Sequence, residues 1–176
     1  MSSYNFERPC QASGRATQPS SKKRESRESM PHNRTLTLDS NVMIAALKKD
    51  EPQSDSCATL LEKIPEQFLL SEPSIVYEEV CGTLARRVGR GAADMAKKQL
   101  DRMISIDRLA QCDRSFCISA YQLCDEYDLY AIDALYLKTA LNHSAVLVSL
   151  DKKDFIDRVN SKPSPIEAFH PSQFPY

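Results

Sequence analysis

Residues 145–151 read AVLVSLD, the clearest strand-forming stretch in the chain, and it ends in an aspartate. A shorter stretch of the same kind, TLTLD, covers residues 35–39. Each is followed by a segment with helical periodicity, so each predicts a short strand that leads into a helix. Strands that alternate with helices favour right-handed crossovers and a parallel sheet covered on both faces. We therefore predict an α/β fold, with any ligand beyond the carboxyl ends of the strands.

The alternation continues from Arg34 to the end of the chain. Further strands are expected at 68–70, 104–106 and 166–169, and helices at 42–49, 55–64, 73–87, 92–102, 115–126, 131–142 and 153–159. Ser40 or Asn41 is expected to cap the first helix, and Pro65 to end the second. Pro73 is expected in the first turn of the third helix, where its missing N–H costs nothing.

Residues 1–33 have a different composition, rich in Ser, Gln, Pro, Lys, Arg and Glu and without apolar periodicity. Such a segment buries too little surface to offset its ordering entropy, so we predict a disordered basic tail at 1–33 and one folded domain at 34–176. Residues 1–34 carry seven basic and three acidic side chains, net +4, which leaves the rest at net −5. A basic tail can contact nucleic acid. The alternative, which we favour, is a start site placed too early, with Met30 as the true first residue.

Composition excludes several classes of protein. The 176 residues, with a net charge of −1 and 41% hydrophobic side chains, suit one ordinary domain. The longest apolar run, 42–47, is too short to span a bilayer, and no secretory signal is evident, so a cytoplasmic protein is expected. Neither GxGxxG nor GxxxxGK[ST] occurs, which excludes the common nucleotide-binding loops. The six cysteines form no CxxC pair and the three histidines are scattered, which excludes a typical zinc site.

Four carboxylates are candidate functional residues because of their positions. Asp39 and Asp151 each follow a predicted strand, where an aspartate also commonly serves as a helix N-cap. Glu79 and Asp133 lie within the apolar stripes of their helices, and neither stripe carries an Arg or Lys partner. Because an ionised carboxylate on a buried face is costly, capping and solvation explain Glu79 and Asp133 poorly.

If the four carboxylates converge, their repulsion must raise their pKa values or be relieved by a cation. Hard oxygen ligands without Cys or His select Mg²⁺ or Mn²⁺ over zinc. Such a site polarises a phosphoryl oxygen and activates a bound water for attack, which suits phosphodiester hydrolysis.

The same residues resemble the motifs of PIN-domain ribonucleases. LDSNV at 38–42 resembles the first motif, and PSIVYEEV at 73–80 with LARR at 84–87 the second. YDLYAIDALY at 127–136 resembles the third and VSLD at 148–151 the fourth. In order and spacing the resemblance spans residues 35–160.

This resemblance implies a three-layer α/β/α sandwich and a Mg²⁺- or Mn²⁺-dependent endoribonuclease that uses metal-activated water. It makes Asp39, Glu79, Asp133 and Asp151 the catalytic metal ligands. Ser40, where Thr is commoner in the family, and Ser149 would orient ligands or water. Asp154 would be either a peripheral carboxylate or a solvated helix residue. The resemblance further suggests a VapC-like toxin with an RNA substrate, usually a homodimer, neutralised by a small antitoxin that covers the active site. The basic tail is not typical of these toxins.

Two other classes of function remain open at this stage. One is a non-catalytic PIN-fold module that binds RNA or protein, and the other is a metal-dependent phosphatase or DNA nuclease with the same carboxylates. The local basic run near the Glu79 helix is either a solvated helix face or a phosphate contact; it comprises Arg86, Arg87, Arg90, Lys97, Lys98 and Arg102.

Overall fold

A computed structural model describes residues 34–64 and 66–176 of the protein. The basic tail predicted at 1–33 and the helix end predicted at Pro65 lie outside the described residues. In the described part, no helix is both long enough and apolar enough to cross a bilayer.

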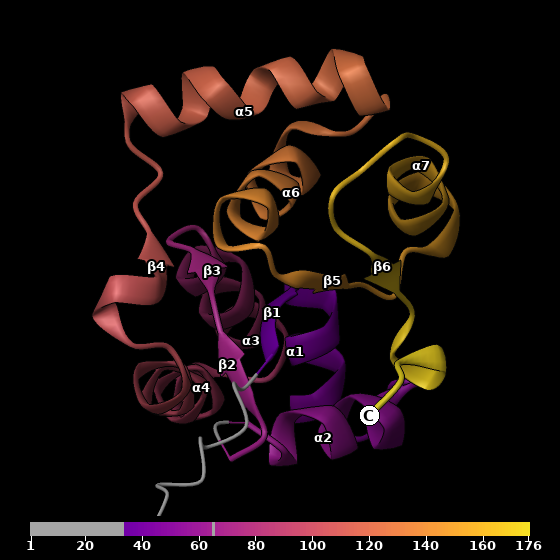
Figure 1. Ribbon diagram of the computed structural model, residues 1–176. Coiled ribbons are helices and arrows are strands. Elements are labelled where there is room, and N and C mark those ends of the chain that lie inside the picture. Colours follow the sequence, from indigo (N-terminus) through magenta and orange to yellow (C-terminus); the bar gives the residue numbers. More distant parts are fainter. Residues whose placement is uncertain (1–33, 65) are drawn as a thin grey trace, which may run out of the picture. The chain divides into compact units, whose positions relative to one another are not determined.

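The order of strands and helices agrees with the predicted α/β fold (Figure 1). The strands are β1 (Arg34–Leu38), β2 (Phe68–Leu70), β3 (Glu72–Pro73), β4 (Leu109–Ala110), β5 (Val146–Val148) and β6 (Ala168–Phe169). The helices are α1 (Ser40–Leu47), α2 (Ser54–Glu62), α3 (Thr83–Arg87), α4 (Arg90–Met103), α5 (Arg114–Tyr127), α6 (Ala131–His143) and α7 (Asp157–Asn160). The π-helical turns η1 (Glu78–Gly82) and η3 (Lys152–Ile156) precede α3 and α7, and the 3₁₀ turns are η2 (Ile106–Arg108) and η4 (Pro171–Gln173).

The central sheet has the strand order β2-β1-β5-β6, and all of its pairs are parallel. Parallel neighbours need crossover connections, and the helices supply them. In the register of β1 with β5, Leu38 pairs with Val148. The carboxyl ends of these two inner strands therefore lie side by side.

Alternating side chains of the sheet enter two separate cores. Val148 packs with buried residues of α1 to α4, such as Val42 and Leu100, whereas its neighbour Leu147 packs with residues of α6 and α7, such as Leu137 and Val159. In Figure 1, α1 and α2 lie on one side of the sheet and α6 and α7 on the other, with α5 packed on α6. The three-layer α/β/α sandwich is confirmed.

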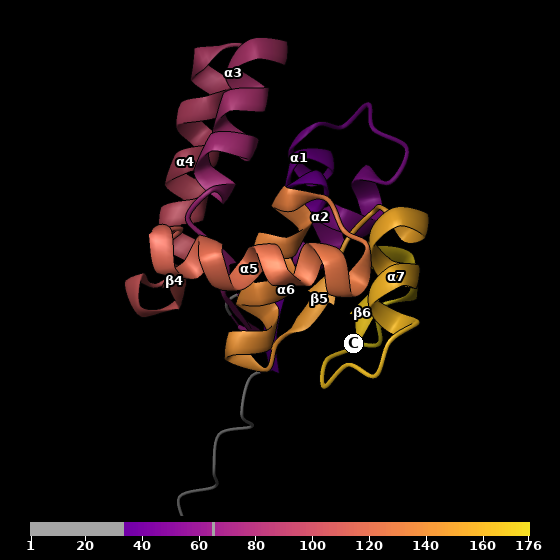
Figure 2. The same ribbon diagram turned by 90° about the horizontal axis from the view of Figure 1, so that it is seen from above.

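Helices α3 and α4 form a pair that projects from the rest of the fold (Figure 2). Leu84 of α3 and Ala93, Ala96 and Leu100 of α4 are buried between them and against the core. The helix that carries Glu79 is thus held on one side by α4.

Two predicted elements differ from the structure. Pro73, expected in a first helical turn, lies in β3 and pairs with Ala110, an edge position where the missing N–H of a proline leaves no ladder bond unmade. The strand expected at 104–106 is wrong, because Ile106 begins a 3₁₀ turn and the strand follows it as β4.

Candidate active site

Asp39 and Asp151 lie at the carboxyl edge of the sheet, after the adjacent strands β1 and β5. The backbone N–H of Asp39 donates to the carbonyl of Val148 at 2.9 Å, so β1 continues its pairing with β5 up to this aspartate. Asp151 follows three residues after Val148 and is the N-cap of η3. The parallel register thus brings together two carboxylates that are far apart in sequence.

The buried carboxylate of Asp39 has a defined set of donors. Its Oδ2 accepts hydrogen bonds of 2.6 Å from both Ser149 Oγ and Asn41 Nδ2. Its Oδ1 accepts the backbone N–H of Asn41 at 3.4 Å, so Asp39 is the N-cap of α1, and the expected caps Ser40 and Asn41 are wrong. Ser40 Oγ is 3.5 Å from Oδ1, at the limit of a hydrogen bond.

Ser149 and Asn41 connect the two strand ends. Ser149 Oγ accepts the backbone N–H of Asp151 at 3.0 Å while it donates to Asp39. Asn41 donates to Ser149 Oγ at 3.2 Å, and its own Oδ1 accepts the backbone N–H of Leu150 at 3.0 Å. This network fixes the loop after β5 to the start of α1, and therefore fixes Asp151 relative to Asp39.

Glu79 reaches the same region from the π-helical turn η1. Its Oε2 accepts a 2.7 Å hydrogen bond from the hydroxyl of Tyr136, a fully buried side chain of α6. Burial raises the pKa of Tyr136 well above its ordinary value, and the charges of Glu72 and Glu79 add to this effect. The phenol therefore stays neutral and donates to Glu79.

Asp133 lies in the first turn of α6, three residues before Tyr136. Burial raises the pKa of Asp133 to about 7, and the charges of Asp39, Asp151 and Glu79 act in the same direction. The guanidinium of Arg158 opposes them. The positive end of the α6 dipole also favours the ionised form, yet burial and like charge outweigh it.

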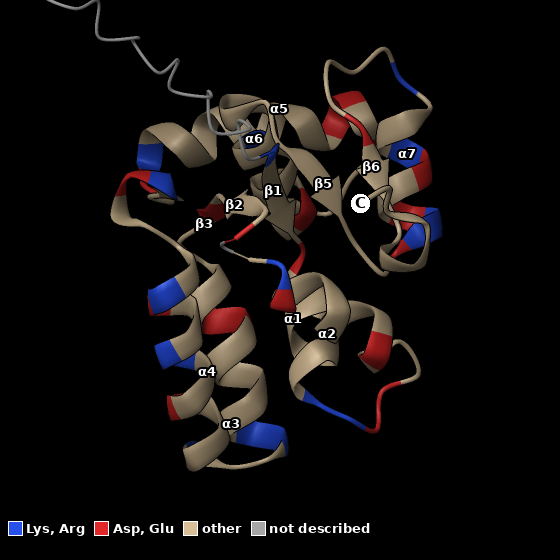
Figure 3. Ribbon diagram, turned by 60° about the horizontal axis from the view of Figure 1, so that its bottom comes forward, with Lys and Arg blue, Asp and Glu red and all other residues tan. Residues whose placement is uncertain are grey.

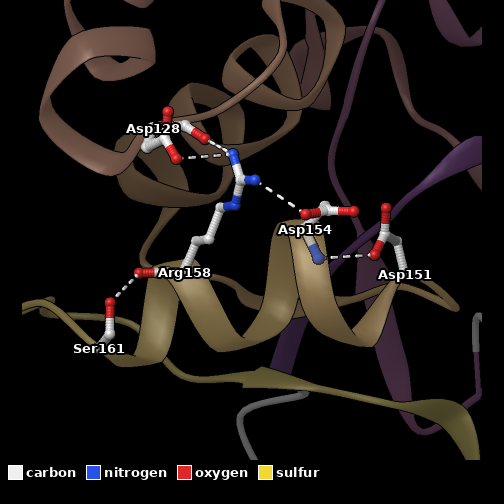
Figure 4. A network of polar contacts seen from close by, with 5 residues as sticks. All are labelled: Asp128, Asp151, Asp154, Arg158 and Ser161. Atoms are coloured by element: carbon white, nitrogen blue, oxygen red, sulfur yellow. Dashed lines mark hydrogen bonds and ion pairs between the residues drawn. The ribbon is translucent and has the colours of Figure 1, made fainter.

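Asp151 and Asp154 belong to a second network, shown in Figure 4. Asp151 Oδ1 accepts the backbone N–H of Asp154 at 2.8 Å and so caps η3, while Arg158 Nη2 donates to Asp154 Oδ1 at 2.8 Å. Arg158 also pairs with the carboxylate of Asp128, at 3.1 Å, and with its backbone carbonyl. Asp154 was expected to be either a peripheral carboxylate of the site or a solvated helix residue. It is half-buried and forms an ion pair with the guanidinium of Arg158, so neither description fits it fully.

The four predicted carboxylates share one region and influence each other electrostatically. Burial raises the pKa of Asp39 to about 6, against the hydrogen bonds from Ser149 and Asn41, and the charges of Glu79 and Asp151 raise it further. Asp39 and Asp151 at the two strand–helix junctions, and Glu79 and Asp133 from helical segments, therefore all contribute negative charge to one region.

The donor set suits a hard divalent cation, because it is made of carboxylates whose mutual repulsion a cation relieves. The carboxylate oxygens do not, however, surround a common point where one ion could bind. Within residues 34–64 and 66–176, no three Asp, Glu, His or Cys side chains are close enough together to hold a metal ion. The four carboxylates thus have the chemistry that a divalent cation needs, whereas their spacing in this structure does not enclose one.

Three residues that contact this site were not identified from the sequence as functional. Asn41 and Tyr136 lie within the quoted motifs LDSNV and YDLYAIDALY, but neither was assigned a role at the site. The i,i+4 spacing of Asp154 and Arg158 is a local signal for their ion pair, whereas the pairing of Arg158 with Asp128 depends on the tertiary fold.

Comparison with known proteins agrees with this fold. The family model described as PIN domain matches residues 36–162. Among solved structures, VapBC2 from Rickettsia felis, bound to a promoter DNA fragment, is 15% identical with a TM-score of 0.56, covering 77% of this chain and 98% of that one. VapC20 of Mycobacterium tuberculosis, described as a toxin that cleaves the sarcin–ricin loop, is 16% identical with a TM-score of 0.54, covering 66% and 87%.

A toxin–antitoxin complex from Klebsiella pneumoniae is 20% identical with a TM-score of 0.54, and the match covers 75% of this chain and 94% of that one. At such identities the likeness establishes the fold. No curated protein matches the sequence significantly.

Proposed function

Because the chain belongs to the PIN-domain family, we propose that it is a Mg²⁺- or Mn²⁺-dependent endoribonuclease that hydrolyses phosphodiester bonds in RNA. The observation that carries the proposal is the electrostatic coupling of four carboxylates from separate segments at one sheet edge. The charges of the other three, Asp39, Asp151 and Glu79, all raise the pKa of Asp133.

In this proposal Asp39, Glu79, Asp133 and Asp151 would hold the ion. When bound, the ion supplies Lewis acidity toward a phosphoryl oxygen and toward the attacking water. The remaining polar groups act on the carboxylates. Ser149 and Asn41 hold the carboxylate of Asp39, and Tyr136 holds that of Glu79, each through a hydrogen bond of 2.6 to 2.7 Å. These short bonds limit the side-chain motion that a catalytic group cannot tolerate.

The proposal extends to a toxin that is neutralised by a small antitoxin and acts as a homodimer. The antitoxin part is supported by two structural neighbours, VapBC2 from Rickettsia felis and the toxin–antitoxin complex from Klebsiella pneumoniae, and the homodimer part rests on the family resemblance alone. We expect a short open reading frame beside the gene. Its product should copurify with this chain and stop its activity.

The test is cleavage of RNA by the purified full chain. We expect Mn²⁺ or Mg²⁺ to support cleavage and a chelator to stop it. Asp39→Asn is expected to lower the rate by ~100-fold or more, in the range seen when a catalytic electrostatic contact is lost. Asp55→Asn, an exposed carboxylate of α2, is the matched control and should cleave at the parent rate. Equal cleavage by Asp39→Asn and the parent would refute the proposal, and faster hydrolysis of DNA or phosphate monoesters would redirect it.

A second candidate is a non-catalytic module that binds RNA or protein. The observation in its favour is that, among the described residues, no three acidic side chains gather closely enough for a metal ion. Calorimetry with Mn²⁺ separates the candidates. Millimolar or tighter binding that is lost in Asp133→Asn supports the enzyme, and no binding by the parent supports the module.

A further inference from the structure

A cavity of about 260 Å³ adjoins the candidate active site on the side of α1 and α3. Its lining includes the apolar side chains of Ile44 and Leu150 and the polar side chains of Asn41, Thr83 and Arg87. None of the four carboxylates lines it. The cavity is therefore a neighbour of the carboxylate site rather than a part of it.

Asn41 and Leu150 form the boundary between the cavity and the carboxylates. Asn41 donates to Asp39, and its Oδ1 accepts the N–H of Leu150, which directly precedes Asp151. A molecule in the cavity that contacts both Asn41 and Leu150 therefore lies one residue away from Asp39 and one residue away from Asp151. The two sites can be occupied by adjacent units of one substrate.

The helix of Glu79 provides a second connection. Glu79, Thr83 and Arg87 are spaced four residues apart along the continuous helical segment η1–α3, so they lie on one face of it. At a rise of 1.5 Å per residue, Arg87 lies roughly 12 Å along this axis from Glu79. A polymer that runs along the face from Glu79 would pass Thr83 and then reach the guanidinium.

The charge of Arg87 is available for a ligand. Within the described ranges Arg87 is exposed and forms no hydrogen bond or ion pair. The nearest acid of the lining, Glu51, is already paired with Lys48 at 2.9 Å. Figure 3 shows that Lys and Arg occur on both helices of the α3–α4 pair, but of these Arg87 is the one that enters the cavity wall.

We propose that this cavity binds the nucleotide next to the scissile phosphate of a single-stranded RNA, with Arg87 on its phosphate. The inference rests on the proposed function. The apolar side chains of Ile44 and Leu150 suit the face of a base or a ribose, and Asn41 and Thr83 offer hydrogen bonds to its polar edges. The volume lies below the usual range of small-ligand sites, so the cavity has room for no more than one nucleotide unit. A base must be unstacked to enter such a cavity, which favours a single strand over a duplex.

The test measures binding of a fluorescent single-stranded RNA to the full chain in chelator, where no cleavage occurs. Arg87→Gln is expected to weaken binding ~10-fold and to reduce the slope of log K against log salt by about 0.7, the share of one phosphate contact on a single strand. Arg86→Gln is the matched control, because it removes the same charge from the same exposed turn outside the cavity, and it should change binding less than about twofold. A duplex of the same sequence should bind more weakly and be insensitive to Arg87→Gln.

The outcomes separate the cavity from the enzyme. Equal losses of RNA affinity in Arg86→Gln and Arg87→Gln would mean that only overall charge matters. That result would overturn the proposed nucleotide site even if the parent cleaves RNA with Mn²⁺. Selective loss in Arg87→Gln from a parent that never cleaves RNA would support the cavity and refute the enzyme. A parent that neither binds nor cleaves RNA would refute both the endoribonuclease and the nucleotide site. If the cavity binds a protein partner instead, the nucleotide site is likewise refuted.

Discussion

The backbone N–H of Leu38 donates a 2.7 Å hydrogen bond to Oε1 of Glu72, a fully buried glutamate. The pairing of β1 with β2 ends two residues before Leu38, where Leu36 pairs with Leu70 and its carbonyl accepts the N–H of Ser71. The chain then turns away to form β3, so Leu38 has no strand partner on this side. The glutamate side chain replaces the missing strand immediately before Asp39.

The same glutamate is expected to make stability depend on pH. Burial raises the pKa of Glu72 well above its ordinary value, outweighing the hydrogen bond from Leu38, and the charge of Asp39 adds to the increase. The folded chain therefore keeps a proton that the unfolded chain releases above about pH 4.5. The free energy of unfolding must fall as the pH rises from there, by up to about 1.4 kcal/mol per pH unit.

Glu72→Gln tests this dependence, because the amide keeps an acceptor for Leu38 but does not titrate. We expect the variant to be more stable than the parent at pH 7 to 8, with a difference that shrinks toward pH 4 to 5. Urea denaturation at four pH values measures it. Glu72→Ala, which leaves the Leu38 N–H buried without an acceptor, should be destabilised by about 1 to 3 kcal/mol at pH 4 to 5, and this loss relative to the parent should shrink as the pH rises. Parallel pH curves for the parent and Glu72→Gln would show that Glu72 is ionised in the fold.

Asp133→Asn is expected to stabilise the metal-free protein at neutral pH. The pKa of Asp133 is raised to about 7, so its ionisation opposes folding above about pH 4, and fully so above 7. Because this side chain is only half-buried, we expect a gain on the order of 1 kcal/mol, seen as an increase of about 2 to 4 °C in Tm at pH 7.5 in chelator. The increase should disappear near pH 4.

Adding Mn²⁺ should reverse this ranking, since only the parent can then gain stability from binding. Asp55→Asn serves again as the control and should follow the parent in both conditions. A gain in Tm by Asp133→Asn that persists unchanged at low pH would point to packing rather than charge.

The fold followed from residues that act locally. The strands at 35–38 and 145–150 and the helix at 131–142 were predicted because hydrophobic pattern and turn residues agree there. Asp39 and Asp151 were identified for a related reason, since a parallel sheet places the ends of its strands at one edge. Such rules need only the sequence around each residue.

The missed features depend on tertiary contacts. Pro73 suits either a first helical turn or an edge strand, and its pairing with Ala110, far along the chain, decides between them. Glu72 has no local signal at all, because its role comes from the point where β2 leaves β1. Ser40 and Asn41 were expected to cap α1, but the structure confirms the alternative, that Asp39 and Asp151 are the N-caps of the segments that follow their strands.

Arg158 is expected to act on the site through Asp133. Its charge lowers the pKa of Asp133, against the larger effect of burial, while its ion pair with Asp128 holds the loop before α6. Arg158→Gln should therefore raise the pKa of Asp133 further, so the Tm gain produced by Asp133→Asn at pH 7.5 in chelator should be larger in an Arg158→Gln background. Arg158→Lys keeps the charge and should leave that gain close to its value in the parent. If Gln and Lys change the gain equally, the loop contact rather than the charge is responsible.

Tyr136→Phe is expected to separate positioning of Glu79 from packing. The phenyl ring fills the same fully buried space, so the core is preserved, but Glu79 loses its 2.7 Å hydrogen bond. We expect a loss of about 1 to 2 kcal/mol in stability and, if the chain is a nuclease, a lower kcat with little change in KM. Tyr127→Phe, a buried tyrosine of the same core, is the control for removal of a hydroxyl. Equal kcat values for the parent and Tyr136→Phe would show that Glu79 needs no donor from α6.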